Sequence, residues 1–162
     1  MTDTSTADLP TTCLELRSTV TDDGKATLAL RRSDIAELGD DQVLVKVEAA
    51  PINPSDLGML FAGGDVSSAA AVDGDLPAVA VSLTPGVLAA SGGRLGKPMP
   101  TGNEGGGTVV GAGSSAGAQA LLGKVVGFLS GNAYAEYRVL HFSQCLAMSD
   151  GTDPADAAAA FV

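Results

Sequence analysis

Alternating apolar and polar positions predict three strands near the N-terminus. Residues 13–20 and 25–31 alternate well enough for two strands, and Asp22-Asp23-Gly24 between them is a typical turn, because glycine readily adopts a positive φ. Residues 42–50 have the clearest strand pattern. Their side chains alternate between two faces, with Val43, Val45 and Val47 on one and Leu44, Lys46 and Glu48 on the other.

Later segments predict further strands and two short helices. Three apolar stretches are typical of strands: 108–110, 124–129 and 133–140. Residues 55–61 are expected to form one or two helical turns, with Asn53 or Ser55 as the cap. Asp153-Pro154-Ala155-Asp156 is a typical helix start, since Asp caps a helix and proline fits its first position. A helix that continues to residue 162 without a C-cap predicts a piece of a longer protein.

The middle of the chain has the weakest pattern. Residues 63–102 are rich in Ala, Gly and Ser and are long for a connection within a compact domain, which is typical of functional loops or lids. Within this segment we expect a short helix at 67–72 and an apolar strand at 76–83.

Composition narrows the class of protein. A chain of 162 residues with 45% hydrophobic content can bury the core of one domain. The net charge of -10 and only nine scattered basic residues oppose binding to nucleic acid, because phosphate contacts need clustered Lys and Arg. No nucleic-acid partner is therefore expected.

Neither a leader nor a membrane segment is predicted. The first eight residues are polar and acidic, unlike a secretory signal. The most apolar tract, 76–90, is interrupted by Pro77, Pro85 and Gly86 and is too short to span a bilayer. Cys13 and Cys145 are interpreted as small buried residues on strands, since two cysteines make no disulfide framework. We expect a cytoplasmic protein without a membrane partner.

Two polar motifs lie beside predicted strands. Asn53-Pro54-Ser55-Asp56 ends the third strand, and Asn103-Glu104 precedes a run of glycines and another strand. Polar groups at strand ends, next to backbone that a ligand can approach closely, indicate a cleft. Together with 123–128 and 134–137, these motifs resemble the N-terminal, GroES-like domain of the medium-chain dehydrogenase/reductase superfamily. The resemblance is closest to its zinc-independent branch of quinone oxidoreductases and enoyl-thioester reductases.

This resemblance implies a fold and a division into domains. The fold would be mainly β, a GroES-like twisted and partly open β-barrel with a few short helices, and without a Rossmann domain in this chain. Residues 1–11 would be a flexible N-terminus, 12–150 the substrate-binding domain, and 151–162 the start of a helix leading to a missing nucleotide-binding domain. The resemblance also implies NADP or NAD bound mainly by that other domain, a small carbonyl, enone or quinone substrate, and a homodimer.

The resemblance also bears on metal chemistry. Zinc-dependent relatives carry a Cys where Asn53 stands, a His where Pro54 stands, and a His-Glu pair where Asn103-Glu104 stands. Amide groups are poor zinc ligands compared with Cys and His. Because only two cysteines exist, a four-cysteine structural site is excluded as well. We therefore expect no zinc.

A reductase without a metal must polarise its acceptor with hydrogen-bond donors. We predict catalytic roles for Asn53, Ser55 and Asp56, and a substrate cleft lined by Met59, Asn103 and Glu104. Structural roles stay open for three of them: Asn53 as a turn residue before proline, Asp56 as a brace of the short helix, and Glu104 as an acceptor of backbone hydrogen bonds.

Three other features of the sequence bear on function. Gly64 stands where enoyl-thioester reductases carry a catalytic Tyr, which favours quinone or enone reduction. The single histidine, His141, is interpreted as a packed or surface residue. The segment 111–116 matches the dinucleotide-binding pattern G-x-G-x-x-A, but the helix candidate at 117–122 is too short for a crossover between parallel strands. We interpret 111–116 as strand and loop of the barrel.

A different class of function remains possible from the sequence. The GroES-like barrel also occurs in a co-chaperonin, and a fold alone does not fix function. The alternative hypothesis is a non-catalytic module that binds proteins or forms oligomers through the apolar tract 76–90.

Overall fold

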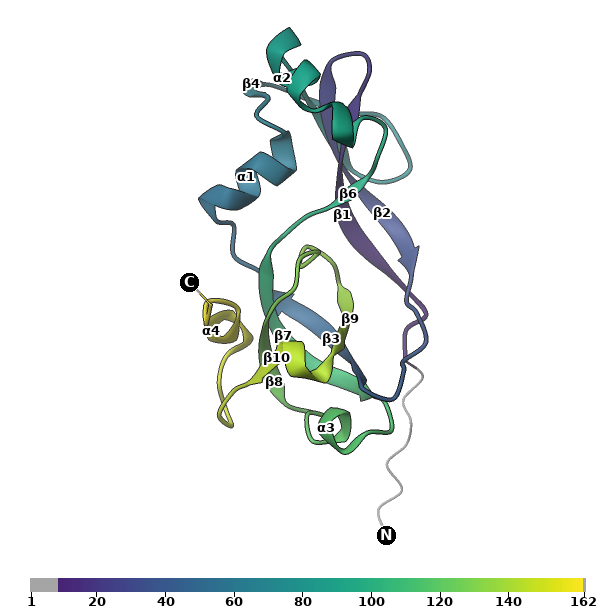
Figure 1. Ribbon diagram of the computed structural model, residues 1–162, viewed down its shortest axis with the longest axis vertical. Coiled ribbons are helices and arrows are strands. Elements are labelled where there is room, and N and C mark those ends of the chain that lie inside the picture. Colours follow the sequence, from purple (N-terminus) through teal and green to yellow (C-terminus); the bar gives the residue numbers. More distant parts are fainter. Residues whose placement is uncertain (1–8, 162) are drawn as a thin grey trace.

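The computed structural model describes residues 9–161 and shows two five-stranded antiparallel sheets (Figure 1). The first sheet has the order β4-β5-β2-β1-β6. Its strands are β1 (Thr12–Thr21), β2 (Lys25–Asp34), β4 (Asp65–Ala71), β5 (Ala78–Ser82) and β6 (Met99–Pro100). The second sheet has the order β10-β8-β7-β3-β9. Its strands are β3 (Gln42–Ala49), β7 (Glu104–Ala112), β8 (Val125–Leu129), β9 (Tyr137–His141) and β10 (Cys145–Ala147).

Only short helices accompany the sheets. They are α1 (Pro54–Phe61), α2 (Pro85–Ala90), α3 (Ala116–Gln119) and α4 (Pro154–Ala158), with 3-10 turns at Gly92–Arg94 and Phe142–Gln144. The predicted mainly β fold, a partly open barrel with few short helices, is confirmed. Among the described residues, no helix has the length and apolarity needed to cross a bilayer. Of the predicted flexible N-terminus at 1–11, residues 1–8 lie outside the described part of the chain.

The predicted hairpin is confirmed. β1 and β2 pair along their whole length, and Gly24 occupies the turn with φ +77°. The strand at 42–50 is also confirmed as β3, between β7 and β9.

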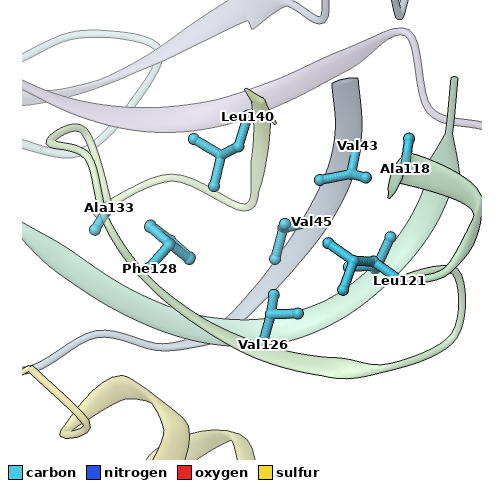
Figure 2. Close-up of a cluster of buried hydrophobic side chains, with 9 residues drawn as sticks. Val43, Val45, Ala118, Leu121, Val126, Phe128, Ala133 and Leu140 are labelled. Carbon is cyan, nitrogen blue, oxygen red and sulfur yellow. The ribbon is translucent and has the colours of Figure 1, made fainter. Parts of the chain in front are cut away.

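The core lies inside the second sheet. Val43 and Val45 of β3 meet side chains from other strands of the same sheet, including Val126 and Phe128 of β8, in one buried cluster (Figure 2). Leu44 points to the opposite face, as predicted, yet it is 1% exposed. It lines a hollow with Leu9 and Leu38, so both faces of β3 are covered here.

The middle segment is more regular than the sequence predicted. The strand expected at 76–83 is β5, but the helix expected at 67–72 is wrong, because these residues belong mostly to β4. Ala70 and Ala71 pair with β5 across the ladder. Tertiary pairing therefore overrides the high helix propensity of alanine. α2, the 3-10 turn and β6 fill the rest of this segment.

Arg94 ties this segment to α1. Its guanidinium donates hydrogen bonds to the carbonyl oxygens of Gly58 and Met59, at 3.3 and 2.9 Å, and to Ser18 Oγ at 3.1 Å. Ser18 in turn donates to the carbonyl of Leu60 at 2.8 Å. Carbonyls at a helix C-terminus lack partners within the helix. The Gly58 carbonyl also accepts the N–H of Ala62, whereas those of Met59 and Leu60 accept from Arg94 and Ser18, so residues 63–102 do not form a detached loop.

Two glycines make room for α4 against the second sheet. A Cβ on Gly106 of β7 would lie 2.3 Å from the carbonyl oxygen of Pro154, and one on Gly127 of β8 would lie 2.4 Å from that of Ala157. The predicted helix start is confirmed, since Asp153 Oδ1 accepts the backbone N–H of Ala155 at 2.8 Å. α4 therefore packs on the sheet at backbone distance.

The remaining predictions differ at their edges. β7 is longer than the predicted 108–110, and β9 begins only at Tyr137. The residues before β9 pair with β1 instead, since Leu16 donates its N–H to the carbonyl of Tyr134 at 2.8 Å and Ala135 forms an antiparallel bridge with Glu15. Cys13 is buried on β1, whereas Cys145 is half-buried on β10.

Candidate functional site

The end of β3 and the start of β7 bring the two polar motifs together. Asn53 has an extended conformation, with φ -93° and ψ 160°, and is the N-cap of α1. Pro54 follows at the first helical position, where its fixed φ suits the helix and its missing N–H costs nothing. Glu104 is the first residue of β7, and Asn103 directly precedes it. All five polar side chains of the two motifs take part in the contacts described next.

Asp56 is fully buried and its two oxygens are both bonded. Oδ2 accepts the backbone N–H of Asn53 at 2.8 Å, and Oδ1 accepts Asn103 Nδ2 at 2.8 Å. The first bond closes the N-terminus of α1, and the second fixes Asn103. These contacts favour the bracing role over proton transfer for Asp56.

Glu104 is bonded on one side only. Asn53 Nδ2 donates to Glu104 Oε1, so the Asn53 side chain reaches across to β7. Glu104 is 5% exposed, and its Oε2 is buried without a hydrogen-bond partner among the described residues. Most buried polar atoms are hydrogen-bonded, so this oxygen has capacity for a further donor.

Two hydrogen-bond donors remain available in the cluster. Asn103 Nδ2 also donates to Ser55 Oγ, at 3.4 Å, and Ser55 itself is exposed. The Ser55 hydroxyl donates to no described residue, so its proton can serve another acceptor. Asn53 uses one of its two amide N–H groups on Glu104 and keeps the second.

Tyr134 belongs to this cluster, although the sequence predicted only aromatic mass for it. Its hydroxyl donates to the carbonyl of Pro51 at 2.8 Å. Burial, followed by the negative charges of Asp56 and Glu104, raises the pKa of Tyr134 to about 12. Gly102 makes room for the ring, because a Cβ there would lie 2.8 Å from it. The sequence signal that could have pointed to Tyr134 is Gly102. This glycine has a positive φ of 84° and leaves room for the tyrosine ring.

An apolar hollow adjoins Tyr134. It has a volume of about 440 Å³ and is open on one side. Its lining is mostly aliphatic: Leu14, Leu16, Leu30, Val47, Tyr134, Ala135 and Glu136. Tyr134 thus contributes both to the polar cluster and to an apolar surface.

The other predicted site features lie apart from the polar cluster. The carbonyl of Met59 is held by Arg94, and its place in a substrate cleft stays a prediction. A Cβ on Gly64 would lie 2.6 Å from the side chain of Val81, so this position has no room for a tyrosine. His141 is exposed, and its Nδ1 accepts the backbone N–H of Ser143 at 3.2 Å.

The glycine-rich segment 111–116 is not a dinucleotide-binding loop. The strands on either side of it, β7 and β8, pair antiparallel, whereas the dinucleotide-binding unit needs parallel strands. Gly111 lies in β7, and a Cβ on Gly113 would lie 2.1 Å from the carbonyl oxygen of Gly39. These glycines serve close packing of the barrel.

The donor set does not fit zinc. Among residues 9–161, no group of three or more His, Cys, Asp or Glu side chains gathers as metal ligands would. Both carboxylates of the polar cluster accept hydrogen bonds from amides, and its remaining side chains are amides and hydroxyls. Zinc prefers thiolate and imidazole ligands.

No protein-family model matches the chain, and no curated protein is similar enough to match it. Solved structures do match over almost its whole length. One is a candidate NADPH:quinone reductase from Mesorhizobium loti, which is 26% identical with a TM-score of 0.59 over 95% of this chain and 41% of that one. A second is the quinone oxidoreductase from Coxiella burnetii, 19% identical, with a TM-score of 0.58 over 91% and 40% of the two chains.

A third solved structure is a candidate zinc-binding dehydrogenase from Clostridium scindens. It is 19% identical, with a TM-score of 0.61 over 92% of this chain and 44% of that one. The chain therefore spans about two fifths of the length of the structures it matches. Because one fold serves proteins described as zinc-binding and as quinone reductases, the fold by itself does not decide the metal.

Proposed function

We propose that this chain, which has the fold of the N-terminal domain of medium-chain dehydrogenases/reductases, is the substrate-binding domain of a zinc-independent, NAD(P)H-dependent oxidoreductase. Its substrate class is a quinone, an enone or a similar carbonyl compound. Solved structures of the same fold include proteins described as quinone reductases, which supports this reaction class.

One observation carries the proposal: two donors in the polar cluster are held in place, and no residue of the described range 9–161 accepts from them. Ser55 accepts from Asn103 and keeps its hydroxyl proton, and Asn53 is held by Glu104 and keeps one amide N–H. Preorganised donors stabilise the negative charge that develops on a carbonyl oxygen during reduction. The carboxylates of Asp56 and Glu104 position Asn103 and Asn53, respectively, by accepting hydrogen bonds from their amides.

The neighbouring hollow supports an apolar acceptor. Leu14, Leu16 and Leu30 line it, and Tyr134 connects it to the polar cluster. Small-molecule sites are typically apolar with a few polar groups that fix orientation. A quinone or enone has this character, since a planar hydrocarbon carries one or two carbonyl oxygens.

The nucleotide cofactor supplies the hydride when it is bound. We place its phosphates on a domain outside this sequence, because 111–116 is barrel strand and loop. The residues of this chain bind and orient the acceptor and present Ser55 and Asn53 to its oxygen. Zinc independence rests on the amides at 53 and 103, which replace better metal ligands.

The test is a set of alanine variants in the polypeptide that carries this domain together with its nucleotide-binding domain. For Ser55→Ala or Asn53→Ala we expect kcat/KM with 1,4-benzoquinone or cyclohexenone to fall about tenfold to a hundredfold. This fall corresponds to a loss of roughly 1.4 to 2.7 kcal/mol of transition-state stabilisation. Initial rates of NADPH oxidation measure the effect.

Ser114→Ala is the matched control. Ser114 lies beyond the far end of β7 and its hydroxyl bonds Asp40, so this variant should keep the parent rate. If Ser55→Ala and Asn53→Ala both change turnover less than about threefold, which is under about 1 kcal/mol, the two residues are structural only.

The alternative module for protein binding gains no support from the apolar tract 76–90. Ala80 and Val81 of this tract are buried in β5, and residues 85–90 form α2. The tract is therefore divided between a strand that pairs on both sides and a short helix.

A further inference from the structure

A polar hollow lies on the face of β1 opposite the leucine-lined one. Side chains alternate along a strand, so Cys13, Glu15 and Arg17 share one face while the leucines at 14 and 16 share the other. The hollow has a volume of about 240 Å³. Its polar lining comes from β1, the end of β2, the turn before β9, and β9: Cys13, Glu15, Arg17, Ser33, Asp34, Asn132, Tyr137 and Arg138.

Glu15 and Arg17 satisfy one another in this hollow. Arg17 Nε and Nη2 donate to Glu15 Oε1 at 2.8 and 2.7 Å, and Ser33 Oγ donates to the same oxygen. Glu15 Oε2 accepts Asn132 Nδ2 at 3.0 Å. Burial alone would raise the pKa of Glu15, but the hydrogen bonds from Ser33, Asn132 and Arg17 outweigh it and lower the pKa. Glu15 is therefore a fully bonded carboxylate and the counter-ion of Arg17.

Arg138 has no such partner. Its guanidinium makes no hydrogen bond or ion pair with any residue of the range 9–161, and its Nε is cut off from solvent. Burial lowers the pKa of this guanidinium, and the nearby Glu15 opposes that effect. Arg138 is half-buried and lines the hollow, so a ligand with an anionic oxygen could bind its guanidinium and offset the cost of the buried, unbonded Nε–H.

The hollow also holds an acceptor without a donor. Asn132 Oδ1 is buried and unbonded within the described part of the chain, while Nδ2 of the same amide is fixed on Glu15. Asn132 has a positive φ of 54°, a conformation that asparagine tolerates well. A ligand for this hollow therefore needs an anionic group for Arg138 and a hydrogen-bond donor for Asn132.

The charges favour a carboxylate over a phosphate. Glu15 is balanced by Arg17, which leaves one positive charge on Arg138 and one negative charge on the exposed Asp34. A single guanidinium pairs with a carboxylate through two parallel hydrogen bonds. A phosphate dianion would meet Asp34 with only one cation to balance it. The volume of about 240 Å³ suits a small metabolite, since drug-sized ligands occupy roughly 300 to 1,000 Å³.

We propose that this hollow binds a small monocarboxylate that carries a neighbouring hydroxyl or ammonium group, with the carboxylate on Arg138 and the donor on Asn132. The site faces away from the leucine-lined hollow and does not depend on the reductase role. It would add a metabolite-binding site to the domain.

The test titrates the 162-residue chain with four probes: glycolate, glycine, acetate and inorganic phosphate. Isothermal calorimetry gives the affinity, and NMR follows the Nε–H signal of Arg138. We expect glycolate or glycine to bind with a Kd of about 1 mM or tighter and to shift the Arg138 signal. Acetate, which lacks the second group, should bind at least about fivefold more weakly, and phosphate more weakly still.

Two variants locate the site, and a third is the control. Arg138→Gln should weaken binding of the better probe at least about tenfold. Asn132→Gly, which keeps the positive φ, should reduce the affinity for glycolate to that for acetate. Arg32→Gln is the control, because Arg32 is exposed and lies opposite Leu14, on the other face of the hairpin. It should keep the parent affinity within about twofold.

Three results would overturn the proposal. The first is no heat and no shift of the Arg138 signal with any probe up to about 20 mM. The second is an Arg138→Gln variant that binds like the parent. The third is phosphate binding as tightly as glycolate, which would mean a general anion site. If Arg138→Gln does not fold, Arg138→Lys keeps the charge without the fork and should still lose most of the affinity.

Discussion

Asp56 and Glu104 are two buried carboxylates with different bonding. Asp56 accepts donors on both oxygens, whereas Glu104 accepts one and leaves Oε2 without a described partner. Each carboxylate accepts a hydrogen bond from one asparagine amide. The two acids therefore position the hydrogen-bond donors that we propose to bind the substrate oxygen. Tyr134 lies beside these two carboxylates, and their negative charges raise its pKa.

Tyr134 should therefore titrate unusually late. Its pKa is raised from 10.0 to about 12, so the protonated phenol stabilises the fold at every pH below about 10, and this contribution is lost as the pH rises through about 12. The chain has two tyrosines, so a Tyr137→Phe variant leaves Tyr134 as the only one. Absorbance of phenolate should give a midpoint near 12. A midpoint near 10, the ordinary value, would contradict the burial and charge described here.

Among the elements, α4 depends most directly on glycine. Gly106 and Gly127 present bare backbone to α4, and Ala157 and Ala158 are buried against them. Arg94 plays a comparable part for α1, since it donates to the carbonyls of Gly58 and Met59 near that helix's C-terminus. Short helices have little stability of their own, so tertiary contacts must hold them.

Replacing glycine by alanine should destabilise the fold where the glycine packs against α4 but not where its surroundings are open. In Gly127→Ala the Cβ would meet the Ala157 carbonyl oxygen at 2.4 Å, so we expect a loss of about 1 to 3 kcal/mol in the free energy of unfolding. Gly58→Ala is the matched control, because nothing lies within 4 Å of its Cβ and the residue is in α1. It should gain about 0.5 to 1 kcal/mol. Urea unfolding measures both, and equal stability of the two variants would refute the packing of α4.

The molecule as a whole is one β-rich domain with the medium-chain dehydrogenase/reductase fold. The resemblance stated from the motifs is confirmed by solved structures that cover 91% to 95% of this chain. Strand order and direction leave no parallel β-α-β unit among the described residues. The acidic balance, with a net charge of -10, also disfavours a site for the pyrophosphate of a dinucleotide.

The 162-residue chain should therefore bind NADPH weakly or not at all and should show no reductase activity alone. Calorimetry of the chain with NADPH checks the first expectation, and NADPH oxidation with 1,4-benzoquinone checks the second. A Kd of about 1 μM would contradict the division of labour that we propose. The same chain joined to its nucleotide-binding domain is the positive control.

Much of the fold could be predicted because it follows from local rules. Alternation identified β1, β2 and β3, the glycine at 24 identified their turn, and Asp153-Pro154 identified the start of α4. β4 could not be found in this way, because alanine and serine have no strand periodicity and only the pairing with β5 fixes them. The second half of the predicted strand 133–140 became β9, while its first half pairs with β1.

The sequence by itself determined which polar residues stand at the ends of β3 and β7, since motif order and strand limits are written locally. Only the tertiary structure decided how they bond. Asn53 and Glu104 are 51 positions apart, and Asp56 and Asn103 are 47 apart. No periodicity along the chain encodes such pairs. Nor does it encode the bond of the Tyr134 hydroxyl to Pro51, or the lack of a partner for the Arg138 guanidinium within residues 9–161. These depend on the sheet bringing distant strands to hydrogen-bond distance, where burial makes each unbonded polar atom costly.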